Sequence, residues 1–513
     1  MSTTPDGLQF PLQSPQQKPS SSKAGRAIIA AALANVDSRS SQQAQSEKNW
    51  RKHYTVHFKQ LVEQGLSSPE ASLKIAEDGL AKAHQTFEFY RDGQKYVLQD
   101  ALTLPAGQLH TFKLTGNSKS APEWYVPYHG QKLQGDALLE QIERWESQGI
   151  VETSHANALR ECVVHPEWFD LSDRTTVLFG AASEAGPLTW LAKWKANIVA
   201  IDLPNTRVWG KIVDTINQGN ATLYAPCTED LPADTSLDIL KEKLGANLLT
   251  QIPEIAKWLL QFEQDLDLAA IAYLDGEKHV RVSMAMDAIM QHVSQQKANT
   301  SLMYMCTPTD VYAVPSEVIE ASKVKYTERS KVQTILSKGV SALSRKHFFQ
   351  KNAHELIQSG DQAYGICDCL VVEQGPNYAL AKRIQQWRAT LARAQGQRVS
   401  INIAPSTTTY SVTKNPLLKA AFNGASLFDV EAFAPETTNA IMAALWIHDL
   451  RNPESVANPE VKLNHPLELM MHGANHGGLW RVAYLARTAL PFAALYGFAT
   501  EKLPKGLLSK LKK

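Results

Sequence analysis

The feature that most constrains the fold is a series of short apolar runs, separated by stretches with helical periodicity. Uninterrupted apolar runs are typical of strands buried on both faces, and their alternation with helices requires parallel strands joined by crossover connections. We therefore predict an α/β fold with a doubly wound parallel sheet. The runs are Thr175–Phe179, Asn197–Asp202, Thr222–Ala225, Leu268–Leu274, Ser301–Cys306 and Arg398–Ala404.

The chain of 513 residues is too long for one simple domain. Its Ser-, Pro- and Gln-rich start predicts a largely disordered N-terminus over residues 1–47. A mostly helical additional domain is expected over 48–170, the sheet domain over 171–450, and a helical C-terminal extension over 451–513.

Two helices of the additional domain have recognisable ends. Ser68 and Pro69 supply a cap and a first helical position. A second helix is expected over Asp136–Gln148, with Asp136 as its cap and Gly149 as its stop.

The charge balance argues against a large electrostatic field as the basis of function. Lys and Arg number 52 against 51 Asp and Glu, so we predict no nucleic-acid partner. The 5 cysteines contain no CxxC pair, which predicts reduced, buried thiols and no metal site. Because no run reaches the roughly 20 apolar residues that span a bilayer, we expect a cytoplasmic protein.

A glycine-containing turn joins the first two predicted strands. Gly180 ends the first strand, and Gly186 stands near the start of the next helix, where free N–H groups favour a pyrophosphate. Asp202 ends the second strand, where a carboxylate accepts hydrogen bonds from an adenosine ribose and repels a 2′-phosphate. The pattern predicts a dinucleotide site of the Rossmann type formed by Gly180, Ser183, Gly186 and Asp202. An ordinary βαβ turn is the alternative.

A tyrosine and a lysine share one face of a later predicted helix. Tyr378 and Lys382 are four residues apart, so their side chains are neighbours on the helix surface. A nearby ammonium lowers the pKa of a phenol and enables it to act as a general acid or base at a carbonyl. The pair therefore predicts acid–base chemistry.

The order of Tyr-x-x-x-Lys, helix, strand and an Ala-Pro-x-x-x-Thr loop resembles the short-chain dehydrogenase/reductase family. The resemblance implies a nicotinamide cofactor and hydride transfer at a carbonyl carbon. It makes Tyr378 the catalytic acid/base and Lys382 a ligand of the nicotinamide ribose. It also implies that the loop with Pro405, Thr407 and Thr409 closes over the nicotinamide.

Two departures from the family concern the predicted site directly. Ser183 and Glu184 stand where the family has a further glycine, and the family's catalytic serine falls at Gly365 or Ile366, which have no hydroxyl. Thr307 and Thr309, which follow the run at Ser301–Cys306, are better candidates for the hydroxyl that polarises the carbonyl. That assignment requires an insertion over residues 315–365, which we expect to form a lid over the substrate opening.

The combined pattern predicts an NAD(P)-dependent oxidoreductase that reduces a ketone or oxidises a secondary alcohol. Asp202 favours NAD(H) over NADP(H), and the apolar lid and tail favour an apolar small-molecule substrate that is bulky or lipid-like. A regulatory or scaffolding protein that binds a dinucleotide without catalysis is the alternative. Self-association into a homo-oligomer is left open.

Two further segments have two interpretations each. Two histidines four residues apart in the segment His472–Arg481 could bind a metal on a helix, but its glycines favour a loop that closes the domain near the substrate or a subunit interface. The basic tail Leu503–Lys513 has the composition of a membrane-surface segment, and a solvated tail is the preferred interpretation.

Overall fold

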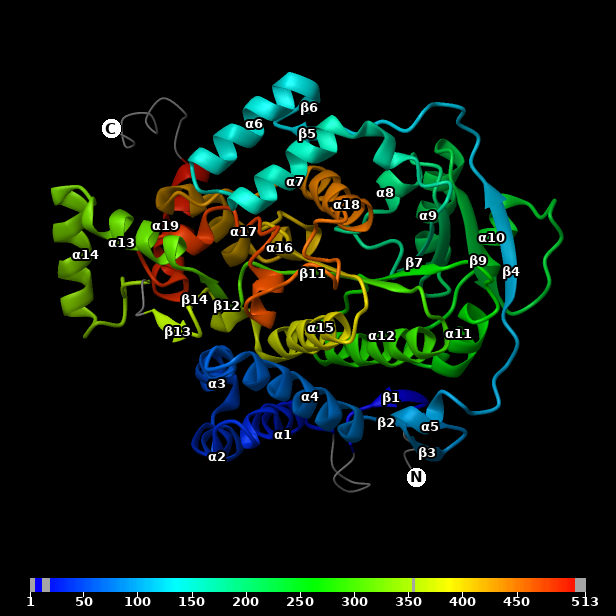
Figure 1. Ribbon diagram of the computed structural model, residues 1–513, viewed down its shortest axis with the longest axis horizontal. Coiled ribbons are helices and arrows are strands. Elements are labelled where there is room, and N and C mark those ends of the chain that lie inside the picture. Colours follow the sequence, from blue (N-terminus) through cyan, green and yellow to red (C-terminus); the bar gives the residue numbers. More distant parts are fainter. Residues whose placement is uncertain (1–4, 12–18, 353–355, 503–513) are drawn as a thin grey trace.

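The computed structural model describes residues 5–11, 19–352 and 356–502, which are arranged around one central sheet (Figure 1). All neighbouring strands pair in parallel except the last two, β9 and β4, which are antiparallel. Numbered in chain order, the parallel strands follow 3-2-1-4-5-6, which is compatible with a Rossmann-like fold. From edge to edge the strands are β15 (Val399–Ile403), β11 (Ser301–Cys306), β10 (Leu266–Ala270), β7 (Thr175–Phe179), β8 (Asn197–Ile201), β9 (Thr222–Cys227) and β4 (His110–Thr115).

The sheet is buried on both faces, which explains the uninterrupted apolar runs. Along β7, Val177 and Phe179 belong to one core cluster, and Leu178 between them belongs to the other. Successive side chains of a strand point to opposite faces, so each strand supplies both clusters. The predicted strands are confirmed, although β10 begins two residues earlier than expected and ends at Ala270.

Helices cover both faces of the sheet (Figure 1). The helices on the two faces pack in pairs, with α15 against α12 on one side and α18 against α8 on the other. One face carries α11 (Ile252–Leu259), α12 (Glu277–Gln296) and α15 (Pro376–Ala394), and the other carries α8 (Leu188–Leu191), α9 (Thr206–Gln218) and α18 (Pro435–Arg451). The short α10 (Leu237–Lys243) packs on α9.

The expected disorder of residues 1–47 is wrong for the described part of this segment. Ile28, Ile29 and Leu33 are fully buried, so the Ala-rich helix offers a continuous apolar face that the polar flanks concealed in the sequence. The segment contains β1 (Gly7–Gln9), α1 (Ser21–Ala34) and α2 (Ser38–Ser46), and is followed by α3 (Trp50–Gly65), α4 (Pro69–Thr86), β2 (Glu88–Arg91), β3 (Gln94–Val97) and α5 (Leu98–Ala101).

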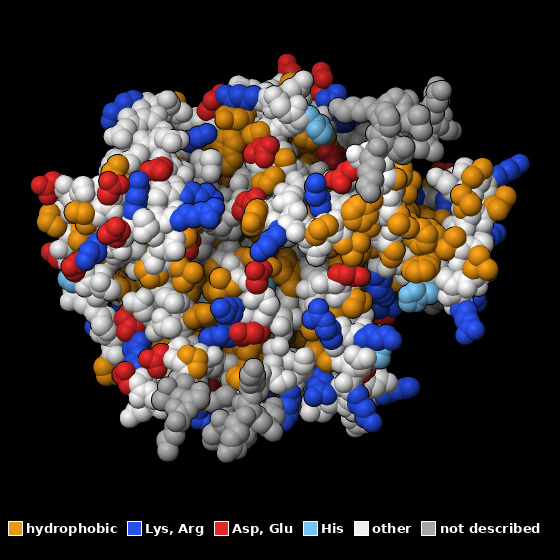
Figure 2. Space-filling view, turned by 180° about the vertical axis from the view of Figure 1, so that it is seen from behind, with side chains coloured by type: hydrophobic (Ala, Val, Ile, Leu, Met, Phe, Trp, Pro, Cys, Tyr) orange, Lys and Arg blue, Asp and Glu red, His pale blue; other side chains and the backbone are white. Residues whose placement is uncertain are grey.

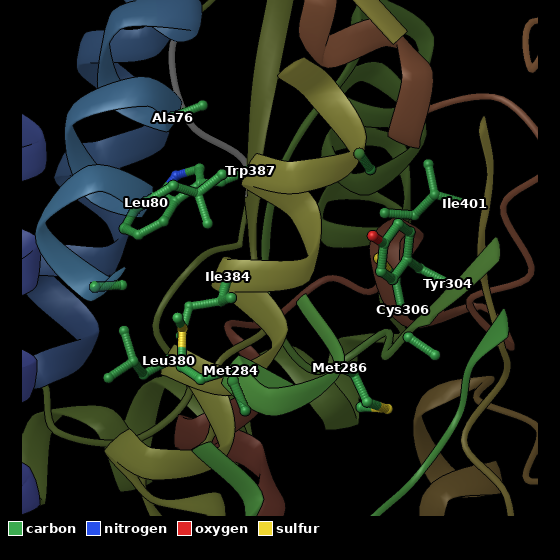
Figure 3. Close-up of a cluster of buried hydrophobic side chains, with 14 of the residues drawn as sticks. Ala76, Leu80, Met284, Met286, Tyr304, Cys306, Leu380, Ile384, Trp387 and Ile401 are labelled. Atoms are coloured by element: carbon green, nitrogen blue, oxygen red, sulfur yellow. The ribbon is translucent and has the colours of Figure 1, made fainter. Parts of the chain in front are cut away.

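The N-terminal helices form a further layer on α15, visible below it in Figure 1. Trp387 of α15 packs against Ala76 and Leu80 of α4 in the cluster drawn in Figure 3. Gly79 makes this approach possible, because a Cβ there would lie 2.5 Å from the Trp387 ring. The N-terminal residues therefore belong to the same core as the sheet.

The segment 48–170 is not a separate helical domain. Its strand β4 is the antiparallel edge of the central sheet, and its helices α6 and α7 lie over α18 on the far face. Trp124 anchors this segment by donating its indole N–H to the carbonyl of Ala440 at 3.0 Å. The remaining elements are β5 (Val126–Tyr128), β6 (Gln131–Leu133), α6 (Gly135–Ser147) and α7 (Thr153–Val164).

The helix ends were predicted with mixed success. Ser68 caps α4 by accepting a hydrogen bond from the Ala71 N–H at 3.1 Å, as expected. Helix α6 begins at Gly135, so Asp136 lies in its first turn and is not the cap. Gly149, with φ of 68°, follows the helix as expected.

The segment 315–365 leaves the central sheet and packs on the C-terminal extension. Ser322 and Asn352 both hydrogen-bond to the carbonyl of Val482, and Arg329 bonds to the hydroxyl of Tyr484. Three strands of this part of the chain form a second sheet in the order β12 (Val311–Pro315), β14 (Gln362–Asp368) and β13 (Ile357–Ser359). Between β12 and β13 the chain forms the helices α13 (Ser316–Thr327) and α14 (Lys331–Leu343). The chain continues after β15 through α16 (Tyr410–Thr413) and α17 (Pro416–Asn423), and ends with α19 (Ala486–Lys502).

Within the described residues, every helix is too short or too polar to cross a membrane. The apolar stretch 482–498 is for the most part α19, with Pro491 inside it and Leu495 exposed. The tail 503–513 lies outside the described residues.

Candidate functional site

The candidate residues gather at the carboxyl edge of the sheet, at the switch between β7 and β10. In an open α/β sheet, the connections from two such strands leave in opposite directions, so a crevice forms outside their carboxyl ends. Gly180 follows β7, Tyr273 comes shortly after β10, and Thr307 follows β11. Three separate strands therefore bring chemistry-bearing residues to one edge.

Gly180 is required by the backbone at the end of β7. Its φ is 90°, and a Cβ at this position would lie 2.5 Å from the Cα of Ala272. The next glycine, Gly186, is also tight, because a Cβ there would lie 3.0 Å from the Ile271 side chain. The turn is thus held against the end of β10, as the sequence pattern requires.

Asp202 holds the glycine turn from the neighbouring strand. Its carboxylate accepts hydrogen bonds from the N–H of Ala182 at 2.9 Å and from the N–H of Leu203 at 2.8 Å. Burial raises the pKa of Asp202, and these two N–H groups oppose the rise. The carboxylate lies where a ribose-binding acid is expected, but two of the hydrogen bonds that it can accept already come from the protein backbone.

The helix after the turn differs from the expectation. Helix α8 has only 4 residues, so it lacks the aligned peptide dipoles that make a helix N-terminus attractive to a pyrophosphate. Ser183 and Gly186 use their N–H groups inside the turn, donating to the carbonyls of Gly180 and Ser183 at 3.0 and 3.1 Å. The pyrophosphate part of the predicted dinucleotide site is therefore poorly formed.

Glu184 connects the turn to the loop after β15. Its carboxylate accepts hydrogen bonds from the N–H of Tyr410 at 3.0 and 3.2 Å, and its carbonyl accepts one from Asn439 at 2.9 Å. The side chain is exposed and bound to this loop. Pro405, Thr407 and Thr409 therefore lie beside the glycine turn.

The hydroxyl of Thr407 is engaged within the protein. It donates to the carbonyl of Pro405 at 2.9 Å and lies 2.8 Å from the hydroxyl of Thr438 on α18. The N–H of Thr409 bonds to the carbonyl of Thr407 at 2.8 Å. The loop is thus a compact turn fixed to α18.

Tyr378 lies in the first turn of α15, after Gly375, which has φ of 85°. Its ring stacks on His279 at 5.3 Å between centroids and meets Tyr273 edge-on at 6.2 Å. Lys382, one turn further along α15, has its Nζ 5.9 Å from the centre of the phenol ring. The structure therefore places Tyr378 and Lys382 on one helix face.

The pKa of Tyr378 moves opposite to the sequence-based expectation. Burial raises it well above its ordinary value, although the hydroxyl of Thr307 lowers it in part. Burial also lowers the pKa of Lys382, whose Nζ donates to the carbonyl of Met305 at 2.9 Å. The expectation of a lowered phenol pKa is wrong for this structure, because desolvation by burial is the largest influence on it.

Thr307 and Thr309 form a pair beside the phenol. Their hydroxyl oxygens are 2.9 Å apart, and the carbonyl of Thr307 accepts a hydrogen bond from Tyr312 at 2.6 Å. Thr307 interacts directly with Tyr378, as its effect on the phenol pKa shows. The structure therefore brings the pair Thr307 and Thr309 to Tyr378 and Lys382, from which they are distant in the sequence.

His279 is a residue of this site that the sequence did not indicate. It is only 2% exposed, and both ring nitrogens have no hydrogen-bond partner in the described part of the chain. Burial and the positive charge of Lys382 lower its pKa to about 3, so the ring is neutral. A single histidine near the start of a helix matches no sequence motif, so its place in this site can be recognised only from the structure.

The histidine-containing loop 472–481 is a structural junction. His476 and Arg481 both bind the carboxylate of Glu152, at 2.7 Å from the His476 Nε2 and at 2.7 and 2.9 Å from the Arg481 guanidinium. Among the described residues, no three His, Cys, Asp or Glu side chains gather in a way that could hold a metal ion. Cys367 and Cys369 are buried free thiols with their Sγ atoms 3.3 Å apart.

Comparison with known protein families found no family model that matches this chain, and no significant match among curated proteins was found.

Proposed function

We propose that this protein is an NAD(P)-dependent oxidoreductase that reduces a ketone or oxidises a secondary alcohol by acid–base chemistry of the short-chain dehydrogenase/reductase type. The observation that carries the proposal is the meeting of Tyr378, Lys382 and Thr307 at the β7–β10 switch point. Ligands of open α/β sheets bind at such a point. An acid, a cation and a hydroxyl are the groups that a carbonyl substrate requires there.

Each residue has a role that follows from its surroundings. The raised pKa keeps the Tyr378 phenol protonated, so it can donate its proton to a carbonyl oxygen during reduction. The nearby ammonium of Lys382 stabilises the phenolate that remains, and the hydroxyl of Thr307 supplies a second hydrogen bond to the substrate oxygen. The chemistry that a nicotinamide would supply when bound here is hydride transfer with the carbonyl carbon.

The two ends of a dinucleotide fit this site better than its middle. A carboxylate has about four acceptor positions, so Asp202 can still accept ribose hydroxyls after binding two N–H groups. Its negative charge disfavours a 2′-phosphate, which supports NAD(H) over NADP(H). The one-turn helix α8 offers little to a pyrophosphate, and we therefore expect weaker binding than in a site with a full helix.

Calorimetry with NADH and NADPH tests the cofactor assignment. NADH is expected to bind more tightly, and Asp202→Asn should reduce the difference between the two cofactors. Tighter binding of NADPH to the native protein would contradict the role given to Asp202. If neither cofactor binds, the proposed dinucleotide site is wrong.

Turnover of apolar ketones, followed by the loss of reduced nicotinamide absorbance, tests the chemistry. Tyr378→Phe should lower kcat by roughly 10²–10⁴-fold and leave NADH affinity nearly unchanged. Tyr304→Phe is the matched control, because this buried hydroxyl on β11 has no hydrogen-bond partner among the described residues. Equal turnover in the two variants would contradict the acid–base role of Tyr378.

A dinucleotide-binding protein without catalysis is the second candidate. It is favoured by the short helix α8 and by the Glu184 carboxylate at a position where the family has a glycine. Under this alternative, NADH binds to the native protein and to Tyr378→Phe alike, and neither consumes it with any ketone.

A further inference from the structure

Helix α14 exposes its apolar side chains and turns a serine toward the protein. The helix is stabilised at its start by a capping box formed by Ser330 and Gln333. Ser337 is its only buried residue and accepts a hydrogen bond from Arg329 at 3.0 Å. The exposed fractions of its large apolar residues are Val332 66%, Ile335 71%, Leu336 63% and Leu343 90%.

These apolar residues form one stripe along the helix. Val332, Ile335 and Leu336 are three and four residues apart, and Leu343 follows Leu336 by seven, so all project from the same side. A helix of a globular protein normally turns such a stripe toward the core. An exposed stripe on a helix at one end of the molecule (Figure 1) marks an interaction surface.

The charged residues of α14 and of the segment that follows it have one sign. From residue 331 to residue 351 the chain contains no Asp or Glu. In a protein whose formal net charge is only +1, this is a local concentration of positive charge. The cations of the segment are Lys331, Lys338, Arg345, Lys346 and Lys351.

Apolar side chains also gather elsewhere at this end of the molecule, as the view from behind shows (Figure 2). Leu495 and Phe498 of the neighbouring helix α19 are 65% and 38% exposed. Phe492 of the same helix packs on Phe348, which follows α14 in the chain. The apolar surface therefore extends beyond α14.

The positive charge selects among the possible occupants of this surface. A second copy of the helix would bring like charges together. The tail 503–513, with Lys505, Lys510, Lys512 and Lys513, carries the same sign and is repelled in the same way. An anionic bilayer surface satisfies both the apolar stripe and the cations, and this is the composition of helices that lie in a membrane interface.

We propose that α14 anchors this protein to anionic membrane surfaces. Val332, Ile335, Leu336 and Leu343 enter the boundary between headgroups and acyl chains, and the flanking lysines and arginine contact lipid phosphates. This surface is distinct from the Tyr378 site, so the proposal does not depend on the proposed chemistry.

Co-sedimentation of the full chain with vesicles tests the proposal. We expect binding to vesicles of equal parts phosphatidylcholine and phosphatidylglycerol, weaker binding at high salt, and little binding to phosphatidylcholine alone. The double variant Ile335→Ser/Leu336→Ser should weaken binding about tenfold or more, because two large side chains no longer enter the interface. Val164→Ser is the matched control, since Val164 is 67% exposed at the end of α7.

The charge is tested by Lys338→Glu, which should weaken binding to the anionic vesicles, whereas Lys338→Arg and the distant control Lys119→Glu should not. Circular dichroism confirms that each variant is folded. Absence of binding by the native chain, or equal binding by the double serine variant, would overturn the proposal. Sedimentation velocity addresses the other occupant: a dimer that dissociates in the double serine variant would assign this surface to a second copy.

Discussion

Two groups of buried polar side chains in this fold have opposite hydrogen-bonding patterns. In the first, Glu152 on the N-terminal side of α7 accepts hydrogen bonds from His476 and from the Nε and Nη2 groups of Arg481. In the second, Tyr378 and Lys382 lie beside His279, whose ring nitrogens have no partner in the described residues. The first group is satisfied internally, whereas the second contains the unpaired His279, although Lys382 beside it donates to the carbonyl of Met305.

The difference separates a structural role from a functional one. Buried polar groups in folded proteins are normally paired, because an unpaired group loses its hydrogen bonds to water without replacement. The protein meets this requirement at Glu152 and fails to meet it at His279. Unpaired groups next to shifted pKa values are typical of sites that bind a ligand. The contrast thus supports the Tyr378 site independently of any motif.

The largest expected effect is on stability at the paired group. Glu152→Gln keeps the shape of the side chain but leaves Arg481 without a negative partner, and should lower the free energy of unfolding by about 3 kcal/mol. Tyr378→Phe should change it by less than about 1 kcal/mol, because little more than one hydroxyl contact is lost. Urea denaturation measures both. A smaller loss for Glu152→Gln than for Tyr378→Phe would contradict the comparison.

The pH dependence of stability sharpens the same contrast. Burial alone would raise the pKa of Glu152, but hydrogen bonds and charges from His476 and Arg481 lower it to about 2. In the unfolded chain its pKa is near the ordinary value of 4.5, so only the unfolded state takes up a proton between these values. This contribution is complete above pH 4.5 and is lost as the pH falls toward 2, by about 3 kcal/mol.

Urea denaturation at a series of acidic pH values measures this loss. The Glu152→Gln variant lacks the carboxylate and therefore should not show the loss of unfolding free energy that its protonation causes. The difference in stability between the native protein and the variant should thus shrink as the pH falls. A constant difference across this range would show that Glu152 titrates normally.

The sequence predicted the sheet well, because strands buried on both faces appear as apolar runs regardless of what surrounds them. It failed where a contact between distant segments decides the outcome. Strand β4 belongs to the sheet because it pairs with β9, and α1 is ordered because α4 and α15 cover its face. Among the site residues, Tyr378 and Lys382 could be found from their spacing, whereas His279 becomes visible only when the fold brings α12 beside α15.

The backbone at the crevice gives a smaller effect. Gly180→Ala combines a left-handed φ with a Cβ only 2.5 Å from the Cα of Ala272. Gly93→Ala is the matched control, because Gly93 has φ of 75° and no atom within 4 Å of the added Cβ. The control should cost roughly 1 kcal/mol for φ alone, and Gly180→Ala about 2 kcal/mol in all. Thermal unfolding measures both, and equal costs would show that the turn can move away from β10.

The smallest effect is expected at the unpaired histidine. His279→Phe keeps a ring for Tyr378 to stack on and removes two buried nitrogens that lack partners, so stability should stay the same or rise by up to about 1 kcal/mol. His155→Phe is the comparison: His155 is fully buried, but its Nδ1 lies 3.0 Å from the carbonyl of Gly473, and losing that bond should lower stability. Turnover should fall several-fold in His279→Phe only, because the polar ring beside Tyr378 is lost there. A loss of stability in His279→Phe as large as in His155→Phe would mean that His279 has a partner in solution, and the contrast between the two groups would no longer mark the site.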